Sequence, residues 1–88
     1  MLSIVIPTLD AGDTLAATLA ALGETAFETE AIVADGGSRD ATRTVAEAAG
    51  ARFVGAPRGR GVQLDAGAAE AGGEWLLFLH ADTVPATG

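Results

Sequence analysis

The sequence predicts a small α/β domain in which helices cover both faces of a parallel sheet, giving three layers. Short apolar runs alternate with segments of helical periodicity, and the loops between them are short. The 88 residues are enough for one domain. Alternating strands and helices with short connections are typical of parallel sheets. The alternation ends on a strand with no helix after it, so we expect a truncated version of this fold.

Four strands are expected, over residues 2–6, 30–34, 52–55 and 74–80. Pro7 is expected to end the first strand, which is rich in β-branched residues. The last strand contains five consecutive large hydrophobic residues, Trp75 to Leu79. A continuous apolar run of this length predicts a strand buried on both faces.

Three helices are expected, and each has small or aliphatic side chains at helical spacing. These positions are Leu15, Leu19 and Leu22 in the first, Ala41, Val45 and Ala48 in the second, and Leu64, Ala68 and Ala71 in the third. Asp10 is expected to cap the first helix, and Ser38 or Asp40 the second. Glycines at 23, 50 and 72–73 are expected to end the helices.

The composition argues against several classes of function. Twelve acidic residues against five arginines and no lysine give a net charge of −7, which is unlike a nucleic-acid-binding surface. The chain has no cysteine, which excludes disulfides and thiolate metal sites. Neither a signal peptide nor an apolar run of the roughly 20 residues needed to span a membrane is present. We therefore expect a cytoplasmic protein, or one at the cytoplasmic face of a membrane.

Polar residues follow the expected strands at the points where they end. In a parallel sheet these ends share one edge, where ligands bind. Asp35 precedes two glycines and could accept a hydrogen bond from a sugar hydroxyl or a base N–H, or simply begin an Asp-Gly turn. Arg60 opens a helix after a glycine, an arrangement that suits a phosphate or a nucleobase carbonyl.

The last strand ends at two candidate metal ligands, His80 and Asp82. In extended backbone they project to the same face, and together they could bind Mg²⁺ or Mn²⁺ that bridges a diphosphate. Such an ion would neutralise charge on a leaving diphosphate. The alternatives are that Asp82 begins a turn with Thr83, and that His80 is bonded to backbone at the strand end.

Three ordered stretches resemble one known family. Residues 3–10 (SIVIPTLD), 33–40 (VADGGSRD) and 78–83 (FLHADT) resemble the N-terminal half of family 2 glycosyltransferases, which are inverting enzymes with the Rossmann-like GT-A fold. Residues 56–68 are similar to a subgroup whose members have "PRGRxxQxNxGA" before "LHADT". The resemblance covers nearly the whole chain.

The resemblance implies that residues 1–88 form the N-terminal donor-binding part of such a domain, with the acceptor half absent and the catalytic base beyond Gly88. It implies a nucleotide-diphosphate sugar as donor, an acceptor of unknown identity, and Mn²⁺ or Mg²⁺ bound by Asp82 with His80. It also implies either a missing C-terminal half or a homo-oligomer. The nucleotide-sugar-binding residues would be Pro7, Thr8, Asp10, Asp35, Gly36, Arg60 and Asp82.

Three residues depart from the family pattern: His80 replaces the first Asp of D-x-D, Asp10 stands where Asn is frequent, and Asp65 where Asn is usual. Two other readings stay open. One is a non-catalytic remnant or an oligomerising half-domain, suggested by the absent base and an open edge on the last strand. The other is a sugar nucleotidyltransferase, although Pro7-Thr8 stands where those enzymes have a glycine-rich loop.

Overall fold

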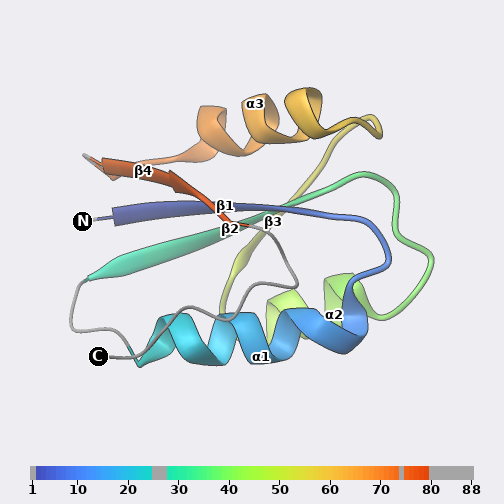
Figure 1. Ribbon diagram of the computed structural model, residues 1–88, viewed down its shortest axis with the longest axis horizontal. Helices are drawn as coiled ribbons and strands as arrows, with labels where there is room; N and C mark the ends of the chain where they lie inside the picture. The colour runs from blue at the N-terminus through green and yellow to red at the C-terminus, as the bar shows by residue number, and fades with distance from the viewer. Residues whose placement is uncertain (1, 25–27, 74, 80–88) are drawn as a thin grey trace.

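Strands and helices alternate strictly along the chain, as the sequence pattern predicts (Figure 1). The computed structural model describes residues 2–24, 28–73 and 75–79. The elements are β1 (Leu2–Thr8), α1 (Gly12–Gly23), β2 (Thr29–Asp35), α2 (Thr42–Ala48), β3 (Arg52–Gly55), α3 (Arg60–Glu70) and β4 (Trp75–Phe78). None of the helices among these residues is long and apolar enough to cross a membrane.

The four described strands form one parallel sheet in the order β3-β2-β1-β4. The carboxyl ends of all four therefore lie at one edge, which confirms the expected α/β fold. The chain adds strands in one direction from β1 to β3, and then returns to place β4 on the other side of β1. This reversal creates a topological switch point at the carboxyl ends of β1 and β4, the kind of place where open α/β sheets bind ligands.

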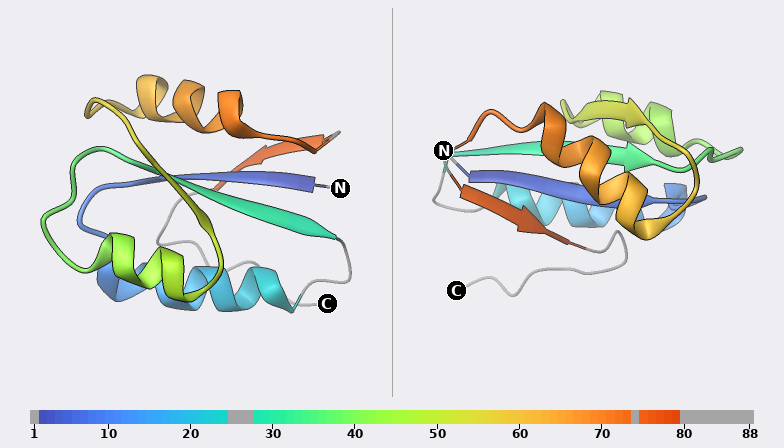
Figure 2. Two further views of the ribbon diagram at one scale, coloured as in Figure 1. Left: turned by 180° about the vertical axis from the view of Figure 1, so that it is seen from behind. Right: turned by 90° about the horizontal axis from the view of Figure 1, so that it is seen from above.

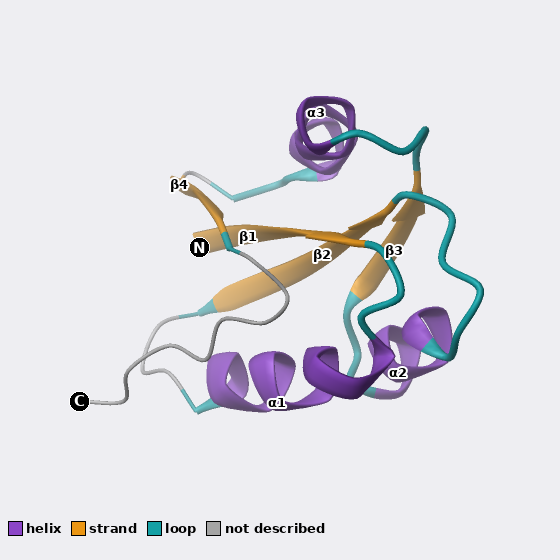
Figure 3. Ribbon diagram, turned by 45° about the vertical axis from the view of Figure 1, so that its right-hand side comes forward, coloured by secondary structure: helices purple, strands orange, loops and turns teal. Residues whose placement is uncertain are grey.

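The helices form the two outer layers of the expected three. Figures 2 and 3 show α1 and α2 on one side of the sheet and α3 on the other. Side chains of β1 alternate between the two faces, as strand geometry requires. Ile4 and Ile6 pack with Leu15 of α1 on one face, while Val5 packs with Ile32 on the other, beneath α3. The core is thus split between the two faces of the sheet.

Helix α3 lies unusually close to β1 because it presents a glycine to the strand. A Cβ atom on Gly67 would lie 2.3 Å from Cγ1 of Val5, well inside van der Waals contact. The fully buried positions of α3 are Gln63 and Gly67, four residues apart on one face. The expected apolar face at Leu64 and Ala68 is only half-buried. The helix is therefore rotated by one position relative to the sequence-based expectation.

Helix α2 departs from the sequence-based expectation in a similar way. Thr42 and Ala46 are its buried residues, whereas Ala41 and Ala48 are exposed and Val45 is half-buried. The predicted apolar face is wrong because alanine is too small to favour burial strongly. The Thr42 hydroxyl instead makes hydrogen bonds in the interior of the loop region, as described below. The leucine face predicted for α1 is confirmed, since all three leucines are buried.

Strand β4 forms where expected, but the prediction that both its faces are buried is wrong. Trp75 is 71% exposed, and Leu76, Leu77 and Phe78 are between 44% and 47% exposed. The reason is its place at the edge of the described sheet: β4 pairs with β1 alone, while α3 packs on β1, β2 and β3. An apolar run in the sequence does not distinguish a central strand from an edge strand.

Candidate functional site

The candidate site lies at the carboxyl edge of the sheet, around the ends of β1 and β2. Strand β1 continues through Pro7 to Thr8, beyond its expected end, and Thr8 pairs in register with Asp35. The described ladder between β4 and β1 stops at Val5, so the missing N–H of Pro7 breaks no bond in that ladder. The Thr8 hydroxyl donates a 2.7 Å hydrogen bond to Asp35 Oδ1. Both side chains are buried.

The Asp35 carboxylate is surrounded by hydrogen-bond donors from the protein. Oδ2 accepts the backbone N–H groups of Gly37 and Ser38 at 3.0 and 2.8 Å. Oδ1 accepts the hydroxyls of Thr8 and Ser38. Burial raises the pKa of this carboxyl, but the donors from Ser38, Thr8 and Gly37 outweigh burial and hold the pKa below its ordinary value. Asp35 is therefore a charged residue that organises its own loop.

A buried glutamine, to which the sequence analysis assigned no function, joins the ends of β1 and β2 to the loop that precedes α3. Gln63 Nε2 donates to the carbonyl oxygens of Thr8 and Ala34 at 2.8 and 2.9 Å. Gln63 Oε1 accepts the backbone N–H of Gly59 at 3.1 Å. Gln63 thus ties β1 and β2 to the loop that precedes Arg60. No signal in the sequence pointed to this role, because the face of α3 expected to be buried was that of Leu64, Ala68 and Ala71.

Gly36 has a different reason to be glycine from the one expected. A Cβ atom at this position would lie 2.8 Å from Gln63 Oε1 and 3.0 Å from its Cδ. The absence of a side chain therefore makes room for the Gln63 amide. The Gly36 N–H also donates to the Thr8 carbonyl at 3.0 Å, so the backbone here closes on β1. The expectation that Gly36 admits a ligand to the backbone stays a prediction.

Asp10 does not cap α1, so that prediction is wrong. The first N–H groups of this helix region are instead bonded by side chains from the β2–α2 loop: Gly12 N–H by Asp40 Oδ2 at 2.9 Å, and Ala11 N–H by Thr42 Oγ1 at 3.0 Å. Hydrogen bonds from the Thr42 hydroxyl and the Gly12 N–H lower the pKa of Asp40. Asp40 also accepts the N–H of Thr42, the first residue of α2, at 3.0 Å. The N-cap residue of α2 is nevertheless Ala41, without a side-chain cap bond, so neither Asp40 nor Ser38 occupies the predicted cap position.

Asp10 joins the β1–α1 loop to the β2–α2 loop. It adopts a left-handed backbone conformation with φ +50°, which aspartate tolerates better than most residues. Its N–H donates to Ser38 Oγ at 2.8 Å, and its Oδ1 accepts the Arg39 N–H at 2.8 Å. Ser38, the other expected cap of α2, bonds Asp10 and Asp35 instead.

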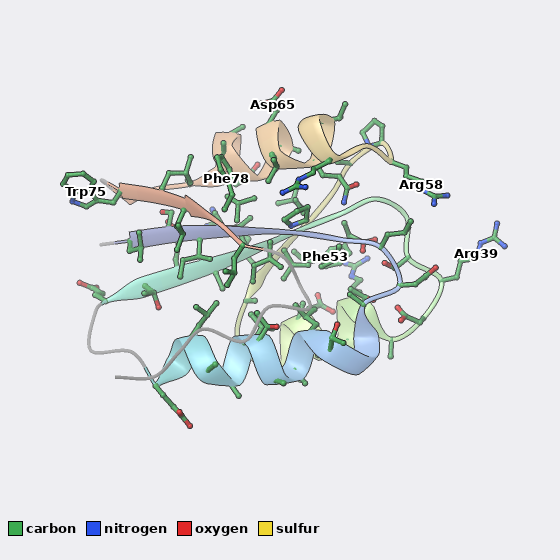
Figure 4. The ribbon with its side chains drawn as sticks, viewed as in Figure 1. Arg39, Phe53, Arg58, Asp65, Trp75 and Phe78 are labelled. Atoms are coloured by element: carbon green, nitrogen blue, oxygen red, sulfur yellow. The ribbon has the colours of Figure 1, made fainter. Side chains whose placement is uncertain are left out.

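The structure brings most of the predicted binding residues to one edge. Pro7, Thr8, Asp35 and Gly36 are adjacent through the pairing of β1 with β2. The loop that precedes Arg60, residues 56–59, is called the Arg60 loop and reaches the same place through Gln63. Arg39 and Arg58 project outward at this end of the molecule, whereas Trp75 lies at the opposite end of the sheet (Figure 4).

The two expected metal ligands, Asp82 and His80, lie outside the described residues. Among the residues that the structure does describe, no group of three or more histidine or acidic side chains is arranged to hold a metal ion. The Asp35 carboxylate is already surrounded by protein donors, so it is a poor candidate ligand.

A parallel sheet covered by helices on both faces, with its strand order reversing at β1, defines a Rossmann-like α/β domain. The family model described as "Glycosyl transferase family 2" matches residues 3–88. The chain therefore belongs to glycosyltransferase family 2. No curated protein gives a significant match.

Solved structures support the same fold. Glucosyl-3-phosphoglycerate synthase from Mycobacterium tuberculosis, crystallised with Mn²⁺, uridine diphosphate and glucosyl-3-phosphoglycerate, matches with a TM-score of 0.80 at 27% identity, over 92% of this chain and 33% of that one. A structure titled only as a mycobacterial protein matches with a TM-score of 0.81 at 31% identity, over 93% of this chain and 31% of that one. S. aureus TarS 1-349 with UDP-GlcNAc matches with a TM-score of 0.80 at 23% identity, over 92% of this chain and 26% of that one. The chain thus spans about a third or less of these proteins.

Proposed function

We propose that residues 1–88 form the nucleotide-sugar-binding part of an inverting glycosyltransferase, of the subgroup with the "LHADT" motif. The observation on which this rests is the organised carboxyl edge, where Thr8 and Asp35 are bonded at 2.7 Å and Gln63 joins them to the Arg60 loop. Family membership supports the reaction class. The complexes of two similar proteins with uridine diphosphate or UDP-GlcNAc support a nucleotide-sugar donor.

In this proposal, the ends of β1 and β2 receive the base and ribose. Pro7, Thr8 and Gly36 would lie against the donor, and Asp35 would accept a hydrogen bond from its base or ribose. A carboxylate has about four lone-pair sites. Since four protein donors already bond Asp35, a base N–H can bond it only by displacing one of them. The Ser38 hydroxyl is the donor best able to rotate away. Asp10 contributes by holding the adjoining loop.

The diphosphate is proposed to lie between the Arg60 loop and the residues after β4. Arg60 is the first residue of α3, so its guanidinium and the helix N-terminus can favour the same anion. Asp82, with His80, would bind a divalent cation, either Mn²⁺ or Mg²⁺. When bound, such a cation neutralises charge on the leaving nucleoside diphosphate. The Mn²⁺ present in the similar mycobacterial complex supports this choice of ion.

The proposed reaction is a single displacement at the anomeric carbon. A bond from the acceptor oxygen forms as the bond to the diphosphate oxygen breaks, and a base removes the proton of the acceptor. We assign neither that base nor the acceptor site to any residue among 1–88. The role of this part of the domain is to bind and orient the donor.

Calorimetric titration of the 88-residue chain with UDP and Mn²⁺ tests the proposal. We expect weak, Mn²⁺-dependent binding that is lost in Asp82→Asn. Asp65→Asn is the matched control, because it removes the same charge from an exposed position on α3 (Figure 4). Absence of binding to the unmodified chain would overturn the proposal. So would equal affinities for the two variants.

A further inference from the structure

We infer that Gln63 is the positioning residue of this edge, which sets the arrangement of the base-side residues relative to the Arg60 loop. The inference rests on the proposed function and adds to it a residue that makes no ligand contact in the proposal. Three segments that are far apart in sequence converge on one carboxamide. They are the end of β1, the end of β2 and the loop before α3, and each contains or adjoins a proposed binding residue.

Both N–H donors and the carbonyl oxygen of the Gln63 amide have protein partners. A glutamine amide has two N–H donors and a carbonyl acceptor. Both donors reach backbone carbonyls, of Thr8 at 2.8 Å and Ala34 at 2.9 Å, and the acceptor receives the Gly59 N–H at 3.1 Å. The side chain is only 5% exposed, so water cannot readily replace these partners. No other side chain of similar size supplies this set.

The site is built around this amide on every side. The chain has glycine at position 36, where a Cβ atom would lie 2.8 Å from Gln63 Oε1. The Gln63 N–H bonds the Gly59 carbonyl at 2.8 Å, so Gln63 is joined to Gly59 twice, once through backbone and once through its side chain. Residue 59 is thereby fixed against the ends of β1 and β2. Arg60 follows immediately.

Two variants test the positioning role. Gln63→Met has a similar length and offers no strong donor, so all three side-chain bonds are lost. Gln63→Glu places an ionisable carboxyl against two carbonyl oxygens and one N–H donor, where burial and the two carbonyl oxygens raise the pKa of the introduced group. In its protonated form this carboxyl can donate to one carbonyl and accept from Gly59. Its ionised form can donate to neither carbonyl.

We expect UDP·Mn²⁺ affinity to fall by about tenfold in Gln63→Met at every pH. In Gln63→Glu the affinity, expressed as a ratio to the unmodified chain at each pH, should recover as the pH falls from about 8 to about 6. Circular dichroism establishes that each variant is folded under the conditions of titration. A role confined to stability would not give a pH-dependent ratio in folded protein.

Ser3→Ala is the matched control. The Ser3 hydroxyl is likewise buried and joins two segments, donating to Glu30 at 2.7 Å and accepting the Gly73 N–H at 2.8 Å, but at the opposite edge of the sheet. We expect it to lose stability and keep its UDP affinity. Wild-type affinity in Gln63→Met would overturn the inference. A flat ratio in Gln63→Glu would do the same.

Amide hydrogen exchange separates this inference from the proposed function. If the unmodified chain binds no UDP, the proposed function fails, but the Gly59 N–H can still be followed by NMR without ligand. We expect its protection to be lost in Gln63→Met and kept in Ser3→Ala. Equal protection of Gly59 in the unmodified chain and Gln63→Met would overturn the positioning role by itself.

Discussion

Asp35 combines two roles at the scale of the single residue, since it is a candidate ligand contact and the centre of its own loop. Its four protein donors stabilise the ionised form over the neutral form. Its pKa therefore lies below the ordinary value of 3.8 in the folded chain. The unfolded chain takes up this proton first as the pH falls. The stabilisation is complete above about pH 5 and disappears once the pH passes below the folded-state pKa.

Asp35→Asn should remove this contribution. We expect the free energy of unfolding at neutral pH to fall by about 1–3 kcal/mol, because the donors lose a charged acceptor. We also expect its decline between about pH 5 and pH 3 to become shallower than in the unmodified chain. Urea unfolding at a series of pH values measures both. Asp65→Asn, an exposed change of the same charge, is the control for net charge; an equally shallow slope there would contradict the explanation.

Residues at strand ends could be predicted from the sequence, whereas the residue that joins them could not. Thr8 and Asp35 follow strands, and parallel strands end at one edge, so their proximity follows from the pattern alone. Gln63 lies within a helix, and its partners are backbone carbonyls of two other elements. Polarity predicts an exposed position for such a residue. Only the approach of α3 to the strand ends gives it enough partners to be buried.

At the scale of the element, the contact between α3 and β1 depends on Gly67. We expect Gly67→Ala to lower the free energy of unfolding by about 1–3 kcal/mol, because the added methyl overlaps Val5 in the core. Gly61→Ala is a matched control in the same helix, where an added Cβ would have no neighbour within 4 Å. That change should stabilise slightly, by up to about 1 kcal/mol, through the better helix propensity of alanine.

The contact between α3 and β1 also positions Gln63. A double variant at Gly67 and Val5 measures how strongly these two residues are coupled. The double variant Gly67→Ala with Val5→Ala should lose less stability than the sum of the two single variants, because the smaller strand residue makes room for the methyl. Thermal melts and urea titrations of the four proteins give the coupling. Purely additive losses would show that the overlap is relieved elsewhere, and that α3 does not depend on this approach.

The presence of each helix could be predicted from the sequence, but which face of the helix is buried was harder to predict. Three leucines at helical spacing gave the correct face for α1. Helices α2 and α3 are alanine-rich, and the small apolar area of alanine barely distinguishes one face from another. Their orientation is decided by polar contacts and close approach, at Thr42 in one and Gly67 in the other. Such contacts involve residues 30 or more positions away, which local periodicity does not encode.

At the scale of the whole molecule, the alternation of elements predicted the parallel sheet but not the order of its strands. The order β3-β2-β1-β4 is what creates the switch point at β1 and leaves β4 at the described edge. The hydrophobic pattern of a sequence shows which strands are apolar, but it gives little information about which strands pair with each other. The exposure of β4 is the consequence that the sequence reading missed.

The exposed strand β4 should make this chain self-associate. Four neighbouring large apolar residues, one of them 71% exposed, lie on the edge strand of the sheet formed by the described residues, and strands of this kind can pair with other chains. The net charge of −7 opposes association, so we expect the apparent mass in sedimentation velocity to rise with protein concentration and with salt.

Trp75→Lys should weaken that association, because it places a charge at the most exposed position of the strand without removing a buried side chain. Val62→Lys makes the same change of net charge at another exposed apolar residue, 47% exposed on α3, and is the matched control. We expect the control to associate at least as much as the unmodified chain once the small difference in charge is screened by salt. Equal weakening by both variants would attribute association to net charge. If both variants associated as strongly as the unmodified chain, the contact between chains would lie away from Trp75.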